Sequence, residues 1–414
     1  MIHTKGRAIT ILSFALVIVT LGFGMIIPLF PFYIEKLGAS GSDYGLLIST
    51  AALFEFLLAP VWGSISDRTG RRPILMIGML GYALSSLLFG LSTELWMLYA
   101  SRALSGLLSS ATSGTAMASI SDSTTEEERS TGIGMLGAAT GLGMILGPGL
   151  GGWLGATSLA LPFFISAGLG LVGLLLIALL LPESLPRATR RAQAARLSQE
   201  AHTPGKMALI QFGEMWRVMW RALASPIGIL LGMLFLVSFG LTNFESVFGL
   251  YAADKLGYGP EHVGTILVVV GIASTLGKAT LIGPLTRRWG EALIARASLL
   301  ASSAGFLLLL LAGQYVAVLL ATGFFILSKT LLRTALLSLA SRRAAVGQGA
   351  VMGLGNSFIN LGRIVGPIWA GVLFDADARY PYISGAAIMA VGFIISLIWV
   401  SQKKGKDGFV ARGL

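Results

Sequence analysis

Two eight-residue segments decide the fold expected for this chain: Gly63-Ser-Ile-Ser-Asp-Arg-Thr-Gly70 and Gly283-Pro-Leu-Thr-Arg-Arg-Trp-Gly290. They lie 220 residues apart, and each follows a long apolar run. A second pair, Gly143-Met-Ile-Leu-Gly-Pro148 and Gly362-Arg-Ile-Val-Gly-Pro367, lies 219 residues apart. Two unrelated motifs that recur at nearly the same offset indicate a duplicated chain, as in transporters built from structural repeats.

The apolar runs around these motifs have the length of membrane-spanning helices. The 414-residue chain is 55% hydrophobic and 12% charged, about half the charged share of a soluble domain, which excludes a soluble fold. The runs are continuous and do not alternate every second residue, so a closed barrel is disfavoured. Each is long enough to cross a hydrocarbon core about 30 Å thick. The sequence predicts an all-α protein with twelve transmembrane helices, at 8–34, 46–65, 74–91, 96–120, 131–154, 159–181, 227–251, 265–285, 293–312, 315–340, 350–374 and 383–401.

The basic residues predict the orientation. If the N-terminus is inside, most lysines and arginines fall in inner segments, whereas the outer loops hold only Lys36, Lys255 and Arg379. This asymmetry predicts cytoplasmic N- and C-termini. The net charge of +11 then reflects topology, and no nucleic-acid partner is expected. The first run is longer than a signal-peptide core and lacks a small-x-small site after it, so we expect it to remain as helix 1.

The duplication predicts four parts. Residues 1–181 form an N-terminal six-helix bundle, 182–226 a cytoplasmic linker, 227–401 a C-terminal six-helix bundle, and 402–414 a cytoplasmic tail. Within the linker, Trp216 and Trp220 are flanked by arginines, which is typical of a helix lying at the membrane interface, here around 207–223.

The composition argues against enzymes and metal proteins. The chain has no cysteine and three histidines, and all three histidines lie outside the predicted spans. We therefore expect no metal site, no cofactor and no catalytic centre. Hydropathy alone also permits a channel, but two six-helix repeats favour alternating access. We expect a monomer embedded in the lipid bilayer.

Four motifs resemble those of a known transporter family. Gly63-x-x-x-Asp67-Arg68-x-Gly70-Arg71-Arg72 resembles the loop signature of the major facilitator superfamily. Gly143-x-x-x-Gly147-Pro148-x-x-Gly151-Gly152 resembles the helix 5 signature of its proton antiporters. Arg102-x-x-x-Gly106 is typical of the twelve-helix drug:proton antiporters. The segment from Phe239 through Glu245 to Lys255 is similar to that of bacterial quinolone and multidrug exporters.

The resemblance implies a function. It implies proton-coupled efflux of amphiphilic drugs or similar small organic molecules by alternating access, in the bacterial plasma (inner) membrane. A facilitator or symporter, or an exporter of an endogenous lipid, siderophore or metabolite, remains the alternative. The quinolone exporters carry a second acid in helix 10, just before an arginine that aligns with Arg333, and this chain has Thr330 there.

Two acids, Glu55 and Glu245, fall inside predicted spans. A carboxylate in hydrocarbon costs several kcal/mol, so each is expected to face a cavity or a partner. Because burial favours its neutral form, each acid is a candidate for loading and releasing a proton. Arg102 is the third candidate for proton coupling. The alternatives are a paired structural charge for either acid, and a buried counter-ion of Glu55 or an interfacial side chain for Arg102.

Aromatic and amide side chains near these acids are candidates for substrate binding, with helix packing as the alternative. The predicted substrate residues are Glu245, Phe244, Phe248, Asn243, Phe54, Tyr33, Arg333, Asn356, Phe358 and Asn360. Basic residues within spans, among them Arg102, Lys278, Lys329, Arg333 and Arg363, outnumber the two acids. We therefore expect zwitterionic or acidic amphiphiles to be preferred over dications.

The first loop motif is a candidate conformational latch. Gly63 and Gly70 are expected to permit a tight turn. Asp67 either pairs with a basic residue or caps the N-terminus of helix 11, and Arg71 or Arg68 is expected to meet Asp122. Plain topology-setting charge is the alternative. The second repeat has Arg287 in place of the acid, so the latch is expected to be one-sided.

The helix 5 motif is a candidate seal. Glycines spaced by four make a stripe without side chains, where a neighbouring helix can pack closely, and Pro148 removes a backbone hydrogen bond. We interpret the glycine stripe as a helix-packing face. If this face lies between the two halves, it would resist leak through the transporter. Its residues are Gly143, Gly147, Pro148, Gly151 and Gly152.

Overall fold

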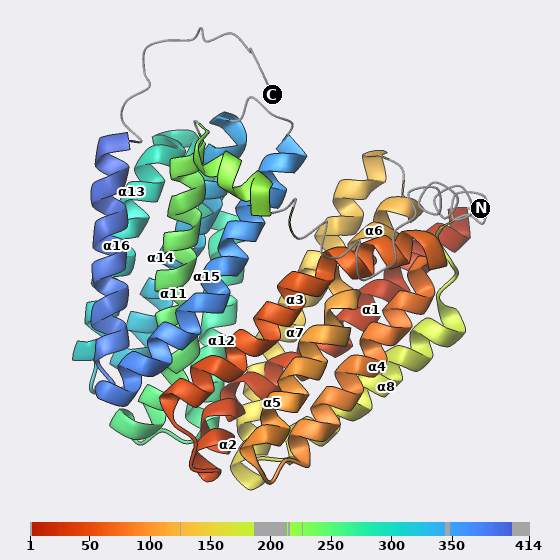
Figure 1. Ribbon diagram of the computed structural model, residues 1–414, viewed down its shortest axis with the longest axis horizontal. Coiled ribbons are helices and arrows are strands. Elements are labelled where there is room, and N and C mark those ends of the chain that lie inside the picture. Colours follow the sequence, from red (N-terminus) through yellow and green to blue (C-terminus); the bar gives the residue numbers. More distant parts are fainter. Residues whose placement is uncertain are drawn as a thin grey trace, which may run out of the picture. The chain divides into compact units, whose positions relative to one another are not determined.

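Helices form along every apolar run that the sequence singles out. The computed structural model describes residues 2–124, 126–185, 213, 216–225, 227–343 and 348–399. All regular structure within these ranges is helical (Figure 1): α1 (Ile2–Ile26), η1 (Ile27–Leu29), α2 (Phe30–Lys36), α3 (Gly41–Thr69), α4 (Arg71–Gly90), α5 (Leu95–Leu104), η2 (Ser105–Ser109), α6 (Ser110–Ser123), α7 (Glu126–Thr157), α8 (Leu161–Leu180), α11 (Gly228–Leu256), α12 (Pro260–Leu276), η3 (Gly277–Leu281), α13 (Ile282–Leu311), α14 (Tyr315–Arg343), α15 (Gln348–Ala376) and α16 (Tyr380–Trp399).

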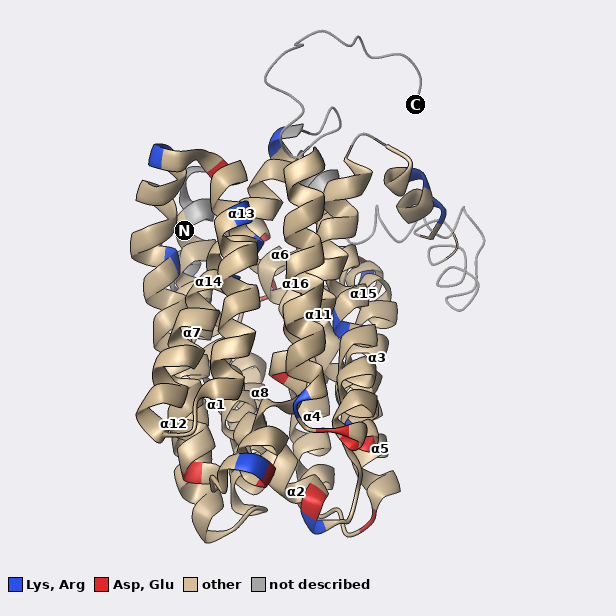
Figure 2. Cartoon of the chain, turned by 90° about the vertical axis from the view of Figure 1, so that its left-hand side faces the viewer, with Lys and Arg blue, Asp and Glu red and all other residues tan. Residues whose placement is uncertain are grey.

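Ten helical stretches in the described residues are long and apolar enough to cross a membrane. The longest, Pro260–Leu311, covers 52 residues and is interrupted at Gly290, where φ is +74°. The stretch from α5 through η2 to α6 is not among the ten. Along the middle of the helices, charged side chains are sparse (Figure 2). The expectation of an all-α, multi-pass membrane protein is confirmed.

The chain divides into two compact units. Unit 1 comprises Met1–Ala39, Leu47–Glu214 and Ala252–Gly271, and unit 2 comprises Ser40–Leu46, Met215–Tyr251 and Ile272–Leu414. Helices α3, α11 and α12 each contribute residues to both units. The predicted boundaries at 181, 226 and 401 stay a prediction.

Unit 1 is organised around α1 and α4. Helix α1 packs against α7 and α8, and α4 packs against α8, η2 and α6. A core of fully buried apolar residues lies among α1, α4, α6, α7 and α8, and includes Leu12, Leu75, Ile120, Leu136 and Ile177. Burying such side chains supplies the packing contacts that hold the helices of a unit together.

Unit 2 is organised around α13. This helix packs against α14 and α16, and α15 contacts both of them. Phe306, Phe325 and Tyr382 are fully buried at its centre. The hydroxyl of Ser238 on α11 donates to the carbonyl of Ile359 on α15, at 2.8 Å. Gly362 lets α15 approach α11 so closely that a Cβ there would lie 2.7 Å from the backbone nitrogen of Phe239.

Most of the predicted linker, 186–212, and the predicted tail lie outside the described residues. Residues 216–223 are helical, in agreement with the end of the predicted interfacial helix. Trp216 and Trp220 are 42% and 61% exposed, whereas Met219 between them is buried. This segment therefore has an aromatic exposed face and an apolar buried face.

Candidate functional site

Glu245 stands out on α11 because its neighbours are all buried. Every other residue from Leu241 through Ala252 is buried, whereas the side chain of Glu245 is 42% exposed. Its Oε1 forms an ion pair with Nζ of Lys329 on α14. Both residues belong to unit 2. An acid and a base that meet in the middle of two apolar helices satisfy each other's charge where water is scarce.

The aromatic residues beside Glu245 are packing residues in this structure. Phe244 and Phe248 are 2% and 4% exposed. The Phe244 ring lies 4.8 Å from that of Phe248 and 4.9 Å from that of Phe325. Asn243 is fully buried, and its amide donates to the carbonyls of Phe239 and Gly240. These three residues are buried together with nearly all of this part of α11, and the predicted substrate contacts stay a prediction.

Arg333 and Arg363 lie within electrostatic range of Lys329, and Lys278 lies within range of Arg333. Arg333 is four residues after Lys329, so both project from one side of α14. Arg333 is in electrostatic range of Lys278 on η3 and of Arg363 on α15, and Arg363 also interacts with Lys329. Lys278, Arg333 and Arg363 are exposed. Within the described residues, none of these three pairs with a carboxylate. Thr330 is buried and its hydroxyl contacts that of Ser274, at 3.4 Å.

Arg102 in unit 1 lies over aromatic rings. Its guanidinium carbon is 4.4 Å from the centre of the Phe30 ring and 5.1 Å from that of Phe89, which is cation–π geometry. Tyr33 belongs to the same aromatic group. It is buried, and its hydroxyl donates to the carbonyls of Gly90 and Ser92, both at 3.1 Å. Tyr33 therefore anchors the end of α4, and its placement does not support the predicted substrate contact.

The other predicted binding residues are scattered. Glu55 is exposed on α3, and no ion pair forms at it within the described part of the chain. Phe54 is half-buried, beside the close approach of Gly106 to α3. On α15, Asn356 is exposed, Asn360 is half-buried, and Phe358 is 5% exposed and packs inside.

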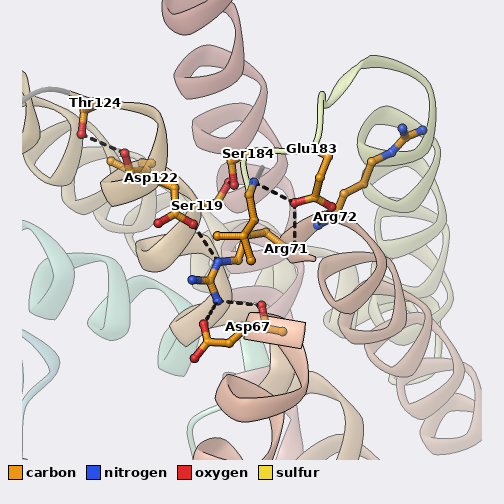
Figure 3. Close-up of polar contacts among 11 residues, drawn as sticks. Asp67, Arg71, Arg72, Ser119, Asp122, Thr124, Glu183 and Ser184 are labelled. Carbon is orange, nitrogen blue, oxygen red and sulfur yellow. Dashed lines mark hydrogen bonds and ion pairs between the residues drawn. The ribbon is translucent and has the colours of Figure 1, made fainter. Parts of the chain in front are cut away.

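Asp67, Arg71 and Asp122 of the predicted latch meet at the start of α4 (Figure 3). Arg71 is the first residue of α4, and its side chain is 9% exposed. Its Nη1 donates to Asp67 at 2.5 Å, and its Nε donates to Asp122 of α6 at 2.8 Å. The predicted meeting of Arg71 with Asp122 is therefore present, and Asp67 uses the same guanidinium. Arg68, near the end of α3, is half-buried.

The turn itself depends on Gly70 alone. Its φ is +112°, a backbone conformation that disfavours residues with a Cβ. Gly63 lies inside α3, with no atom within 4 Å of the position of a Cβ. The prediction that Gly63 helps to form the turn is wrong, because α3 continues through Gly63 to Thr69 and ends just before Gly70.

Sequence reasoning missed Glu183. Its Oε1 accepts from the backbone nitrogen of Arg71 at 2.8 Å, and its Oε2 accepts from that of Arg72 at 3.2 Å. These N–H groups have no partner inside α4, and the helix N-terminus favours a negative charge. Arg72 also donates to the carbonyl of Ala178, near the end of α8. An acid two residues after a long apolar run was the available signal.

The second repeat has an ion pair of its own. Glu291 directly follows Gly290, and its Oε1 accepts from Nη2 of Arg342 at 2.9 Å and from the hydroxyl of Ser338 at 3.2 Å. Glu291 is 8% exposed. The position equivalent to Asp67 is Arg287, and the acid of this pair stands at residue 291, so the one-sided latch stays a prediction.

The helix 5 motif has two different faces. A Cβ at Gly147 would lie 2.5 Å from the carbonyl oxygen of Leu21 on α1, and Gly143 and Gly151 also face α1. Gly152 faces α12, where a Cβ would lie 2.9 Å from Gly264, and a Cβ at Gly264 would lie 2.5 Å from the carbonyl of Pro148. The predicted stripe therefore packs inside the N-terminal repeat, and only the face with Pro148 and Gly152 meets a helix of the C-terminal repeat.

Long apolar helices, ion pairs at their ends and a few charges in their middle are the features of a multi-pass membrane protein. The profile of the Major Facilitator Superfamily matches residues 12–347 and 230–412, and the chain belongs to this family. It is 30% identical over 383 residues to Multidrug resistance protein 2 of Bacillus subtilis (strain 168), with 92% of each chain covered.

Two further comparisons agree with this assignment. The chain is 27% identical over 392 residues to the quinolone resistance protein NorA of Staphylococcus aureus (strain COL), covering 95% of this chain and 96% of the relative. The crystal structure of the human organic anion transporter MFSD10 (TETRAN) matches the fold with a TM-score of 0.65 and 23% identity, covering 95% and 99% of the two chains.

Proposed function

We propose that this chain is a proton-coupled exporter of amphiphilic organic molecules that works by alternating access. The observation that carries the proposal is Glu245, the exposed acid in an otherwise buried stretch of α11, in a chain similar to multidrug and quinolone resistance proteins. While Glu245 is ionised it pairs with Lys329. When the pair opens, an isolated carboxylate in the membrane takes up a proton to avoid the cost of a bare charge.

The proposal includes the topology. The chain crosses a bacterial plasma membrane twelve times as a monomer, with six helices in each of the bundles 1–181 and 227–401 and with both termini in the cytoplasm. The excess of lysine and arginine in the segments assigned to the inside supports this orientation. The ten apolar stretches become twelve crossings if Pro260–Leu311 is divided at Gly290 and the continuous helix from α5 to α6 is added.

Arg71 and the residues around it are proposed to stabilise one conformational state of the cycle. Two carboxylates from α3 and α6 share its guanidinium, and a contact of this kind must break if these helices move apart. Arg102, on the aromatic rings of Phe30 and Phe89, and Glu55 are proposed to act in proton coupling alongside Glu245.

The test is transport in proteoliposomes with an imposed pH gradient. Drug-driven proton movement is expected for the wild type and is expected to be lost in Glu245→Gln. Glu94→Gln is the matched control, since Glu94 is exposed and precedes α5. Coupling that survives in Glu245→Gln removes this residue from the proton pathway, and efflux without any response to the gradient contradicts proton coupling altogether.

A symporter or facilitator for an anionic metabolite is the second candidate. The excess of cations over acids in unit 2 favours it. A proton on Glu245 would neutralise this acid, so the net positive charge available to bind an anion would increase. The same proteoliposomes separate the two functions, since symport requires substrate and protons to move in the same direction.

A further inference from the structure

The basic side chains in the middle of unit 2 have too few acidic partners for a purely structural role. Lys278, Lys329, Arg333 and Arg363 lie on η3, α14 and α15, and Glu245 is the one carboxylate that pairs with any of them in the described residues. A structural pair would neutralise its members, whereas this group keeps an excess of positive charge. Like charges gathered in a membrane are costly, so they persist where something negative completes them.

Packing of η3 on α14 brings the backbone at Lys278 near the level of Lys329. A Cβ at Gly277 would lie 2.9 Å from the side chain of Leu327, and the hydroxyls of Ser274 and Thr330 are in contact. Lys278 is the residue after Gly277, and Lys329 is the residue before Thr330. The π-helical geometry of η3 shifts the register of this helix at Lys278, as is frequent at functional sites.

Arginine at two of the four positions favours one ligand chemistry. The guanidinium is always charged and presents a fork of N–H groups that fits carboxylate, sulfonate or phosphate oxygens. Arg333 and Arg363 interact with each other electrostatically and remain exposed. An aromatic or alkyl cation would instead be repelled by this group and would find only Glu245, which Lys329 already occupies.

We propose that Lys278, Arg333 and Arg363 bind the anionic group of the transported amphiphile, and that Glu245 competes with this group for Lys329. The substrate class is then an organic anion or a zwitterion with an exposed carboxylate, sulfonate or phosphate. This inference rests on the proposed transport function and adds to it the chemistry of the ligand.

Binding to the purified full chain in nanodiscs of zwitterionic phosphatidylcholine tests the proposal. The probes are fluorescein, an anion, and rhodamine 6G, a cation with a similar ring system. Fluorescein is expected to bind more tightly, and Arg333→Gln or Arg363→Gln is expected to weaken it about tenfold, the loss of one charge-assisted contact. Arg379→Gln is the control, since Arg379 is exposed beside Asp377 and outside the group. Tighter binding of rhodamine 6G overturns the proposal.

Glu245→Gln separates this inference from the transport proposal. It is expected to abolish proton coupling but to keep or tighten fluorescein binding several-fold, because the competing carboxylate is gone. Loss of fluorescein binding in Glu245→Gln overturns the anion site and leaves the transport test untouched. Arg333→Lys keeps the charge but loses the fork of N–H groups, so its fluorescein binding is expected to lie between that of the wild type and that of Arg333→Gln. If Arg333→Lys binds as weakly as Arg333→Gln while remaining folded, positive charge at this position does not bind the anion, and the proposal is overturned.

A lipid headgroup carries the same chemistry as a free organic anion. Nanodiscs that contain phosphatidylglycerol distinguish the two sources. Unchanged fluorescein binding in these nanodiscs identifies a site for soluble anions. If phosphatidylglycerol displaces fluorescein from the wild type but not from Arg333→Gln, the ligand is an anionic lipid. This result overturns the proposal of a free amphiphile.

Discussion

The two repeats place an ion pair at equivalent positions but with opposite signs. In the first repeat, Arg71 follows the positive-φ Gly70 and pairs with Asp122. In the second repeat, Glu291 follows the positive-φ Gly290 and pairs with Arg342. Residue 291 is 220 after residue 71, and residue 342 is 220 after residue 122. In both repeats, the residue after the turn is buried and charged, so it requires a partner of opposite charge. This requirement is met whether the base or the acid is the buried residue.

The surroundings make the two pairs unequal. Arg71 has a second acid, Asp67, and its side chain is 9% exposed. Arg342 is 71% exposed, and Glu291 has the Ser338 hydroxyl as its other partner. Two acids share the buried guanidinium of Arg71, whereas the guanidinium of Arg342 is solvated, and a solvated ion pair contributes little. The comparison therefore predicts that the first repeat depends more strongly on its pair.

Reversing the charge at Arg71 is expected to have the largest effect. Arg71→Glu places a third carboxylate beside Asp67 and Asp122, and we expect a loss of about 3–5 kcal/mol in the free energy of unfolding. The double variant Arg71→Glu/Asp122→Arg recreates the arrangement of the second repeat and is expected to recover part of that loss. Thermal unfolding of the purified protein in detergent measures both. A double variant that is less stable than Arg71→Glu would contradict the equivalence of the two sites.

The close helix approaches of the two repeats are expected to differ by a smaller amount. A Cβ at Gly147 would meet backbone atoms of Leu21 and Gly24, whereas a Cβ at Gly366 would first meet the side chain of Thr242. Backbone cannot rotate away, so Gly147→Ala is expected to cost about 1–3 kcal/mol and Gly366→Ala less. Thermal unfolding checks the order, with Gly137→Ala as the control because no atom lies within 4 Å of that position. The reverse order would mean that α1 and α7 separate more readily than their contacts indicate.

The smallest effect is expected for Arg342→Ala. Its side chain is largely solvated, so its pair with Glu291 is expected to contribute at most about 1 kcal/mol. Glu291 keeps the Ser338 hydroxyl. The melting temperature in detergent should therefore shift much less than in Arg71→Ala. Equal shifts for the two variants would show that the repeats depend on their pairs to the same degree.

The fold was largely predictable because an apolar span is recognised from the summed hydropathy of its own residues. The predicted spans coincide with helices, and the offset of 220 residues identified the repeats. Glu245 was also identifiable, since a single acid in an apolar run needs no neighbour to be noticed. Glu183 and Glu291 were missed as site residues, because both lie beside helix ends and their meaning depends on N–H groups or side chains brought near by packing.

The sequence by itself determined the all-helical class, the repeat and the residue types that must find partners in the membrane. Only the tertiary structure decided which partners they find. Phe244 and Phe248 pack in the core, Lys329 pairs with Glu245, and Arg102 lies over aromatic rings. The physical reason is that helix formation depends on local hydropathy, whereas a buried charge is satisfied by whichever group the packing of distant helices places within a few ångströms.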